Sequence, residues 1–315
     1  PFQDASFRID LEVREEKADK AEADKKEASE ENFDVQTDPY MDSVQKILDA
    51  VRSKEFSSAK EAFSDNGYRI YNDLVMYGNA ELLLEDTELK TFKLNDQMIV
   101  RSVPMKFSFP RNDTEFTENV VFTFNKEGKI DALTFALSDI AVNDILNKPD
   151  KFGTVEEKIQ LIQFMEVYKT AYCLEKIDYI ESIFADNALI IVGTVLKEGE
   201  NIGEMYESLS NDKKVKYEKM GKQEYIRRLR KVFKTNEFVN IRFEDNKVEK
   251  RNNQKIYALE IKQKYYSANY SDEGYLFLLM DLRDMEKPQI YVRAWQPDSM
   301  KTDDRLQLAD WKFDF

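Results

Sequence analysis

The chain has 315 residues, of which 42% are hydrophobic and 34% charged, and its formal net charge is −14. This length suits two domains, and the hydrophobic share is large enough for each domain to build a core. The acidic balance argues against a nucleic-acid binder, which needs a basic surface, and against docking onto an anionic membrane. Because no apolar run is long enough to span a bilayer, we also expect no integral membrane segment.

Histidine and cysteine, two residue types that often act in catalysis and metal binding, are nearly missing. The sequence has no histidine and a single cysteine, Cys173. Without histidine there is no Ser-His-Asp triad and no histidine-ligated metal, and one cysteine cannot form an internal disulfide or a thiolate zinc site. Cys173 lies in an apolar helical pattern, which predicts a buried and unreactive thiol. We therefore expect no metal and no cofactor.

The first 35 residues form a charged segment. Residues 14–32 read REEKADKAEADKKEASEEN and contain no apolar face. This composition predicts a solvated helix or a flexible linker, with an interaction tail as the alternative.

The first predicted folded unit covers residues 36–150. Pro39 suits the first position of a helix, and apolar residues then recur on one helical face. A second, short helix over residues 56–63 ends at the sequence SDNG. Strand-like runs follow, the last two of which form a predicted hairpin around Gly128; the runs are YRIYNDLVMYG, MIVRSVPMKFSFP, NVVFTFN and KIDALTFALS.

The second predicted unit covers residues 151–315 and repeats this order with one more helix. Thr154 and Glu157 form a capping box that opens a helix reaching to about Glu175. A short helix, the strand NALIIVGTVL and the helix KQEYIRRLRKVFK come next. Three strands close the unit, with the sequences QKIYALEIKQKYYS, GYLFLLMDLR and QIYVRAWQP.

Two internal matches indicate that the units are related. EFSSAKEAFSDN, residues 55–66, aligns without gaps on KIDYIESIFADN, residues 176–187, and VVFTF from Val120 aligns on YLFLL from Tyr275. The second offset is larger than the first by about one helix and its loops, and the shared order predicts tandem domains. We expect the Asp-Asn pair of each block to end a helix and to turn the chain into the first strand of each sheet.

The order of elements resembles the NTF2-like (cystatin-like, SnoaL-like) α+β fold. The resemblance lies in TVEEKIQLIQFMEVYKTAYCLEKIDYIESIFADNALIIVG and in KIYALEIKQKYY, GYLFLLMDL and IYVRAWQP; it covers residues 154–297 well and residues 38–138 less completely. It implies two tandem units, each a curved antiparallel sheet wrapped around a long N-terminal helix, with a cone-shaped pocket. The whole chain is also similar to uncharacterised cell-envelope proteins of Bacteroidetes, which implies a periplasmic or cell-surface location.

The same resemblance raises the question of catalysis. NTF2-like enzymes such as ketosteroid isomerase and scytalone dehydratase hold an acid–base residue in the cone. Here this role would fall to Asp281 or Glu260, in a small-molecule isomerase, dehydratase or hydrolase. The alternative is that both carboxylates are solvent-facing or pair with Arg283, Arg293 or Lys262 across the strands, since alternation alone does not fix which face points into a cone.

Aromatic residues give a stronger indication of binding. Tyr257, Tyr275, Arg293 and Trp295 are large amphipathic groups at sheet positions, where they would line the cone and stack a planar or sugar-like ligand. An ordinary aromatic core is the alternative. In the basic stretch over residues 213–234, the same logic predicts a helix with a buried apolar side and solvated Arg and Lys side chains.

The strand that contains Tyr275 is apolar on both faces, so both faces need a cover. The sequence therefore predicts pairing of the two units, or a homodimer, through the outer sheet faces. Our leading interpretation is a non-catalytic ligand-binding or protein-assembly module of the bacterial cell envelope, with an unknown small molecule or protein as its partner and no nucleic acid. The small-molecule enzyme remains the alternative.

Overall fold

The computed structural model describes residues 39–83, 91–94, 97–149, 152–195, 208–209, 214–251 and 254–298. All of them belong to one compact unit that begins at Pro39. The charged segment predicted over residues 1–35 lies outside the described residues. Within those ranges, no helix combines the length and the apolar character needed to cross a membrane.

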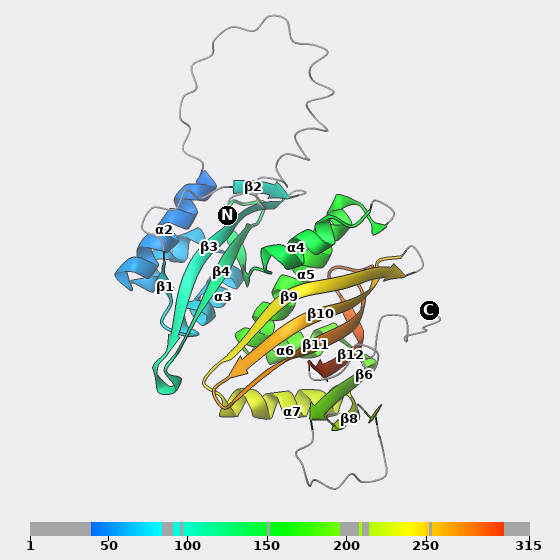
Figure 1. Ribbon diagram of the computed structural model, residues 1–315. Coiled ribbons are helices and arrows are strands. Elements are labelled where there is room, and N and C mark those ends of the chain that lie inside the picture. Colours follow the sequence, from blue (N-terminus) through cyan, green and yellow to red (C-terminus); the bar gives the residue numbers. More distant parts are fainter. Residues whose placement is uncertain are drawn as a thin grey trace, which may run out of the picture. The chain divides into compact units, whose positions relative to one another are not determined.

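The first part of the chain builds a five-stranded sheet (Figure 1). The strand order is β1–β3–β4–β5, with β2 also on β3, and every neighbouring pair is antiparallel. Its strands are β1 (Glu81–Leu82), β2 (Thr91–Leu94), β3 (Gln97–Phe109), β4 (Thr114–Phe124) and β5 (Ile130–Phe135). Its helices are α2 (Pro39–Ser53), η1 (Phe56–Ala62), α3 (Asp65–Met76), η2 (Pro110–Asn112) and α4 (Asp139–Leu146).

The second part builds a seven-stranded sheet in the order β7–β8–β6–β12–β11–β10–β9. Its neighbouring strands are antiparallel except for β12 and β6, which are parallel. Its strands are β6 (Phe184–Val195), β7 (Ser208–Leu209), β8 (Lys214–Gly221), β9 (Val239–Arg251), β10 (Ile256–Ser267), β11 (Tyr270–Asp281) and β12 (Gln289–Pro297). Its helices are α5 (Val155–Cys173), α6 (Ile177–Ile183) and α7 (Lys222–Thr235). The predicted α+β class is confirmed, and four long strands close the chain where the sequence predicted three.

The run YRIYNDLVMYG, predicted as a strand, is wrong and belongs to helix α3. Ser64 is the N-cap of this helix, and its hydroxyl accepts a hydrogen bond of 3.0 Å from the backbone N–H of Gly67. Gly67 is needed because a Cβ there would collide with the carbonyl oxygen of Ile130. Tyr71 and Leu74 are fully buried at helical spacing, so the alternation of aromatic and aliphatic residues in this run reflects one helix face.

The Asp-Asn pairs of the two matched blocks therefore have different roles. Residues 65–66 begin α3, whereas residues 186–187 lie inside strand β6. The expectation that each pair ends a helix and turns the chain into a strand is wrong for the first block, and in the second block the pair lies inside the strand, after the helix has ended at Ile183. What the blocks share is the short helix before the pair, η1 in one case and α6 in the other.

The phenylalanine that follows each short helix has the same kind of partner in both sheets. Phe63 forms an isolated parallel bridge with Ile130, the first residue of β5. Phe184 pairs in parallel with Ile290, near the start of β12. A single bridge in the first sheet thus occupies the position at which a full parallel strand pair runs in the second.

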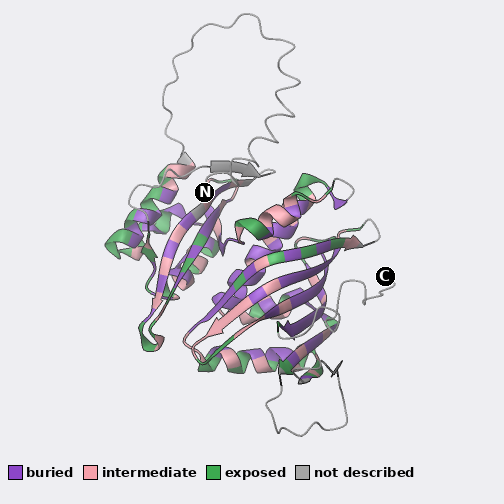
Figure 2. Ribbon diagram, viewed as in Figure 1, coloured by how far each residue is buried: buried purple, intermediate pink, exposed green. Residues whose placement is uncertain are grey.

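Helix α5 is buried on nearly all sides and contacts both β5 and β9. Its capping box is present as predicted, since Thr154 and Glu157 exchange hydrogen bonds of 3.1 and 3.2 Å. One hydrophobic core includes side chains of α5 and of both sheets. Figure 2 shows that buried residues continue along the strands of both sheets.

Strand β11 is buried on both faces, as its composition predicted. Leu276, Leu278 and Met280 belong to the core around α5. Phe277 and Leu279 belong to a second, smaller cluster on the other face of the sheet. That cluster consists of Ile191, Ile256, Ala258, Phe277, Leu279, Val292 and Ala294.

Candidate functional site

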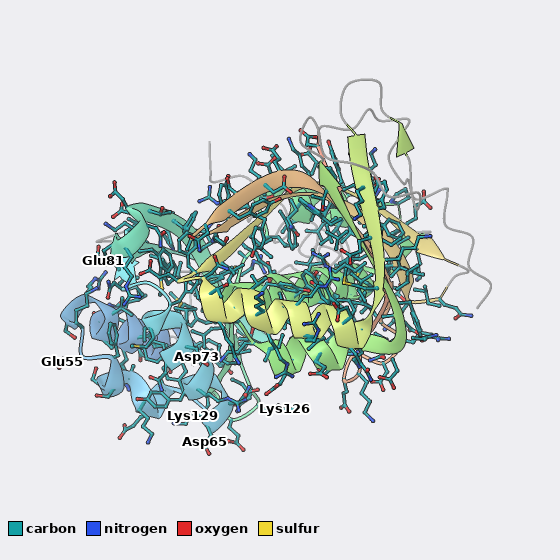
Figure 3. All side chains as sticks on the ribbon, turned by 90° about the horizontal axis from the view of Figure 1, so that it is seen from below. Glu55, Asp65, Asp73, Glu81, Lys126 and Lys129 are labelled. Atoms are coloured by element: carbon teal, nitrogen blue, oxygen red, sulfur yellow. The ribbon has the colours of Figure 1, made fainter. Side chains whose placement is uncertain are left out.

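Strand register decides which side chains of the seven-stranded sheet share a face. Side chains of directly paired residues project to the same side. Arg293 pairs with Leu278, which also pairs with Leu259, and both leucines are part of the core around α5. We call this side of the sheet the helix-facing side. In Figure 3, α7 (yellow) and the green helices lie on the same side of this sheet, beneath its arching orange strands.

Three of the four predicted ligand-binding residues share the helix-facing side. Trp295 pairs with Leu276, and Tyr257 pairs with Met280, so both face the same way as Arg293. Tyr275 lies two residues before Phe277 and projects to the opposite side. The structure therefore does not bring Tyr275 together with the other three, because β11 is apolar on both faces and its alternation alone does not identify the inner one.

Three tyrosines from two helices surround the Arg293 side chain, which is only 9% exposed. Its Nε donates a hydrogen bond of 3.3 Å to the hydroxyl of Tyr168, and its guanidinium carbon lies 5.2 Å from the centre of the Tyr225 ring. The hydroxyls of Tyr172 and Tyr225 are 2.7 Å apart. The charge is thus stabilised by a ring face and by neutral hydroxyls.

No carboxylate within the described ranges lies at salt-bridge distance from Arg293, and its two terminal amino groups have no acceptor among those residues. A buried charge of this kind is normally paired, because taking it out of water is costly. The guanidinium remains charged at any pH at which the protein is folded. The terminal amino groups of Arg293 therefore present unused donors at a largely buried position that solvent still reaches.

The tyrosine hydroxyls are also donors. Burial raises the pKa of Tyr225 to about 12 and that of Tyr172 well above its usual value, so both stay protonated at neutral pH. The hydroxyls of Tyr172 and Tyr225 have two protons, and the hydrogen bond between them uses one. The other proton therefore remains for donation to a further acceptor.

The Trp295 side chain packs near the start of β11. Its indole lies over Gly274, where an added Cβ would be 2.9 Å from the ring. Its Nε1 donates to a carboxylate oxygen of Asp272 at 3.2 Å, and the hydroxyl of Tyr270 donates to the same oxygen at 2.6 Å. Since Arg293 and Trp295 are two residues apart on one strand face, their Cα atoms are about 7 Å apart. The indole thus lies on the same sheet face as the guanidinium, with its nitrogen bound to Asp272.

Tyr257 lies farther along the same face and packs against Phe152, with ring centres 5.6 Å apart. Burial, with a smaller contribution from the charge of Glu157, raises the pKa of Tyr257 to about 12. Its hydroxyl is buried and has no hydrogen-bond partner within the described ranges. A buried hydroxyl without a partner is unfavourable and is a candidate for contact with a ligand or water.

The two predicted carboxylate bases lie on the other side of the sheet. Asp281 accepts several hydrogen bonds from Arg283, the shortest of 2.5 Å; burial would raise its pKa, but these bonds and the arginine charge lower it. Glu260 pairs in register with Phe277 and lies 3.5 Å from Lys247 Nζ. The expectation of a carboxylate base in the cone is thereby corrected, since neither group is next to the tyrosines.

Sequence reasoning placed the three tyrosines in helices but not in a site. Tyr168 and Tyr172 lie in the helix predicted to open at Thr154, and Tyr225 lies in the basic stretch for which a helix with a buried apolar side was predicted. The available signal was chemical, because a phenol hydroxyl inside a core needs a polar partner. Without the register of β12, the sequence did not identify Arg293 as that partner.

A surface groove and the acidic residues give weaker indications of a functional site. A surface groove of about 540 Å³ at the start of α7 is lined by charged groups that pair with one another, Lys222 with Asp186 and Glu224 with Arg227. The groove is lined by Asp186, Gly221, Lys222, Gln223, Glu224 and Arg227. Within the described part of the chain, no group of three His, Cys, Asp or Glu residues is arranged to hold a metal.

Charged side chains labelled in Figure 3 lie on the outside of the first part of the chain. Asp73 forms an ion pair with Lys176, and Glu81 with Lys106 at 3.3 Å. Their charges are therefore balanced locally, as is usual for a solvated surface.

The chain has partial structural similarity to known proteins but no match in sequence. No protein-family profile matches the chain, and neither does any curated protein sequence. Three solved structures are similar in part. A protein of unknown function with a cystatin-like fold from Nostoc punctiforme is 11% identical, covers 47% of this chain and 96% of its own, and has a TM-score of 0.31. Bd1075 of Bdellovibrio bacteriovorus is 10% identical, with 70% and 97% covered and a TM-score of 0.34. Naphthalene 1,2-dioxygenase with bound indole is 11% identical, with 49% and 82% covered and a TM-score of 0.34. At these TM-scores the fold is best described by its own elements and strand pairing.

Proposed function

We propose that this chain is a non-catalytic binding module whose ligand lies on the helix-facing side of the seven-stranded sheet. The observation that supports this most directly is the Arg293 guanidinium, which is buried without an acidic partner among the described residues. Folded proteins rarely bury a charged side chain unless another group accepts its remaining hydrogen bonds. A ligand in contact with Arg293 and Trp295 would do so.

A catalytic role has less support. The best carboxylate candidate, Asp281, pairs with Arg283, and its lowered pKa makes it a weak base. The enzyme alternative therefore has no observation that favours it over binding.

The tandem arrangement of units over residues 36–150 and 151–315 is part of the same proposal. The matching bridges Phe63–Ile130 and Phe184–Ile290 support it. We further propose that the outer face of β11, which is apolar and whose Phe277 and Leu279 are at most 1% exposed within the chain, serves assembly by pairing within the chain, with a homodimer as the alternative. Light scattering of the purified chain tests the homodimer. The bacterial cell envelope, proposed from the sequence resemblance, is tested by cell fractionation.

Binding is tested by screening a small-molecule library against the full chain by thermal unfolding and calorimetry, followed by crystal soaking of each hit. Arg293→Met and Trp295→Ala should each weaken the binding of a hit by about tenfold or more, from the loss of a charged hydrogen bond or of a large aromatic contact. Arg228→Met is the matched control, because this arginine is exposed and bound to Glu218. Unchanged affinity of an identified ligand for both site variants would reject the assignment.

A further inference from the structure

We propose that the ligand bound at Arg293 carries a carboxylate group attached to an apolar body, and that this carboxylate pairs with the Arg293 guanidinium. This inference rests on the proposed binding function and adds the chemical class of the ligand. It is carried by the unpaired donors of Arg293, the hydroxyls of Tyr168, Tyr172 and Tyr225, and the apolar side chains around them.

The geometry of the donors favours a planar anion. The Nε of Arg293 is already used by Tyr168, which leaves the two terminal amino groups. These groups present parallel N–H bonds, which match the two oxygens of a carboxylate. The second hydroxyl proton of the Tyr172–Tyr225 pair supplies one further hydrogen bond to either oxygen.

The charge balance favours a carboxylate over a phosphate. The guanidinium is the single positive charge at this point of the site, and the three phenols are neutral. A carboxylate neutralises one positive charge, whereas a phosphate at neutral pH brings up to two negative charges and needs further cations when it is buried. Within the described ranges, the side chains in polar or ring contact with Arg293 are tyrosines, not a lysine or a second arginine.

The surroundings favour an apolar body. In the register of the sheet, Arg293 lies between Leu278 and Ile190, and both belong to the same core. Trp295 adds an indole on the same face, and Tyr225 adds a ring that packs against Phe184 at 5.5 Å. Leu278 and Ile190 are fully buried by the chain itself, so the apolar surface left to a ligand beside Arg293 is the exposed part of Trp295 and Tyr225, 7% and 8% of each residue.

The first experiment measures the melting temperature of the full 315-residue chain with sodium acetate, octanoate and benzoate, with sodium phosphate, and with neutral benzamide. Sodium chloride at matched ionic strength is the reference. We expect octanoate or benzoate to raise the melting temperature, acetate to do so less, and benzamide and phosphate to match chloride, because stabilisation follows the affinity of each probe for the folded state.

The second experiment repeats the series with three variants. Arg293→Met removes the charge at similar length, Arg293→Lys keeps the charge without the paired N–H groups, and Tyr225→Phe keeps the ring but removes one hydroxyl. We expect affinity for the best carboxylate to fall about ten- to hundredfold in Arg293→Met, about tenfold in Arg293→Lys, and less in Tyr225→Phe.

A further readout separates a ligand site from a purely structural role. In the absence of carboxylate, Arg293→Met should melt at the same temperature as the natural chain or higher, because it removes a buried charge without an acidic partner. It should also lose the response to carboxylates. A purely structural arginine would instead give a lower melting temperature in every buffer. Arg228→Met, with its exposed guanidinium, should change neither quantity.

The inference is overturned if benzamide or phosphate stabilises as well as benzoate, if no carboxylate of the series stabilises the chain relative to chloride, or if Arg293→Met binds carboxylates unchanged. In each of these cases the proposed binding function still stands if another small molecule binds and the Arg293 or Trp295 variants weaken its binding. The binding function fails separately if no member of the library binds at all.

Discussion

Arg101 and Arg293 are both largely buried arginines, but their surroundings differ. Arg101 donates to both carboxylate oxygens of Glu166 at 2.5 and 3.0 Å, and one of these oxygens also accepts from the backbone N–H of Leu137 at 3.1 Å. That charge is neutralised inside the fold and holds β3 to α5. Among the described residues, Arg293 has tyrosines and no carboxylate as polar partners, so its remaining donors are available to a further acceptor. The comparison separates a residue that serves the fold from one that serves a ligand.

Cys173 should be unreactive in the folded chain. It is fully buried, and burial raises the pKa of its thiol to about 12. Only the thiolate attacks disulfide reagents, so at pH 8 the reaction should be roughly a thousandfold slower than in the unfolded chain. Release of thionitrobenzoate from Ellman's reagent, followed with and without guanidinium chloride, measures this. Rapid labelling of the native chain would contradict the burial.

Glu175 should make the chain less stable as the pH rises from about 4.5 to about 7. Burial raises the pKa of its carboxyl from 4.5 to about 7, and within the described ranges no cation forms an ion pair with it. In that window the folded state binds the proton that the unfolded state has released, so stability is greatest below the lower value and is lost up to the higher one.

The measurement is the urea midpoint of the natural chain and of Glu175→Gln across this pH range. The variant should lack this part of the slope and should be at least as stable at pH 8. An identical slope in both proteins would exclude Glu175 as its source. Glu55→Gln, at an exposed position, is the control.

At the scale of elements, the sequence predicted helices and hairpins well where capping or turn residues marked their ends. Helix α5 begins at its predicted capping box, and the hairpin turn has Gly128 at φ 72°, as its type of turn requires. Helix α3 was missed because its aromatic and aliphatic residues are also frequent in strands, and the N-cap Ser64 lay in a sequence that also fits a helix end. Strand β9 was missed because it is rich in charge and a bulge interrupts its alternation.

The candidate site was predicted in part for a related reason. Alternation along β12 placed Arg293 and Trp295 on one face, and the structure agrees. It did not place β12 against β11, so Tyr275 was assigned to the same pocket although it projects to the other side. The tyrosines of α5 and α7 come from segments about 60 to 120 residues away along the chain, and such contacts are fixed by tertiary packing rather than by any local pattern.

Thr154→Ala should destabilise the chain by about 1 kcal/mol, since it removes the N-cap of α5. The hydroxyl of Thr154 accepts from the backbone N–H of Glu157 at 3.2 Å. Thr154→Ser keeps this acceptor and should restore most of the loss, and both variants are compared by urea unfolding. Equal destabilisation by Ala and Ser would show that the methyl group, not the cap, is the stabilising part.

At the scale of the whole molecule, α5 joins the two sheets through a buried polar cluster. Lys169 donates to Glu118 on β4 at 2.6 Å and to the carbonyl oxygen of Ala136 at 2.9 Å. Asn240, on β9, donates to the other oxygen of Glu118 at 2.8 Å. Because strands of both sheets and the helix meet in this cluster, its integrity couples the two sheets.

Lys169→Met should therefore destabilise the chain by about 3 to 5 kcal/mol, because it leaves the Glu118 carboxylate buried without its cation. The double variant Lys169→Met with Glu118→Gln should lose less than the single one, since the side chain at position 118 is then neutral. Urea unfolding by circular dichroism and by tryptophan fluorescence measures both, and the two probes should coincide if the sheets unfold together.

The matched control is Lys264→Met, in which the lysine of an exposed pair with Glu244 is replaced. It should change stability by about 1 kcal/mol or less. A similar loss in the exposed and the buried variants, or a double variant as unstable as the single one, would show that the cluster does not couple the sheets.

The position of α5 also bears on the order in which the chain is made. A ribosome completes β1 to β5 before it makes α5, and β9 to β12 only after that. While it is being synthesised, the helix finds Arg101 and Glu118 already in place for Glu166 and Lys169. Its other side, with Tyr168 and Tyr172, lacks β9, the strand of the second sheet that it contacts, until about 70 further residues have been added. Since chains fold from the N-terminus during synthesis, we expect the first sheet to form before the second and the site at Arg293 to be completed late.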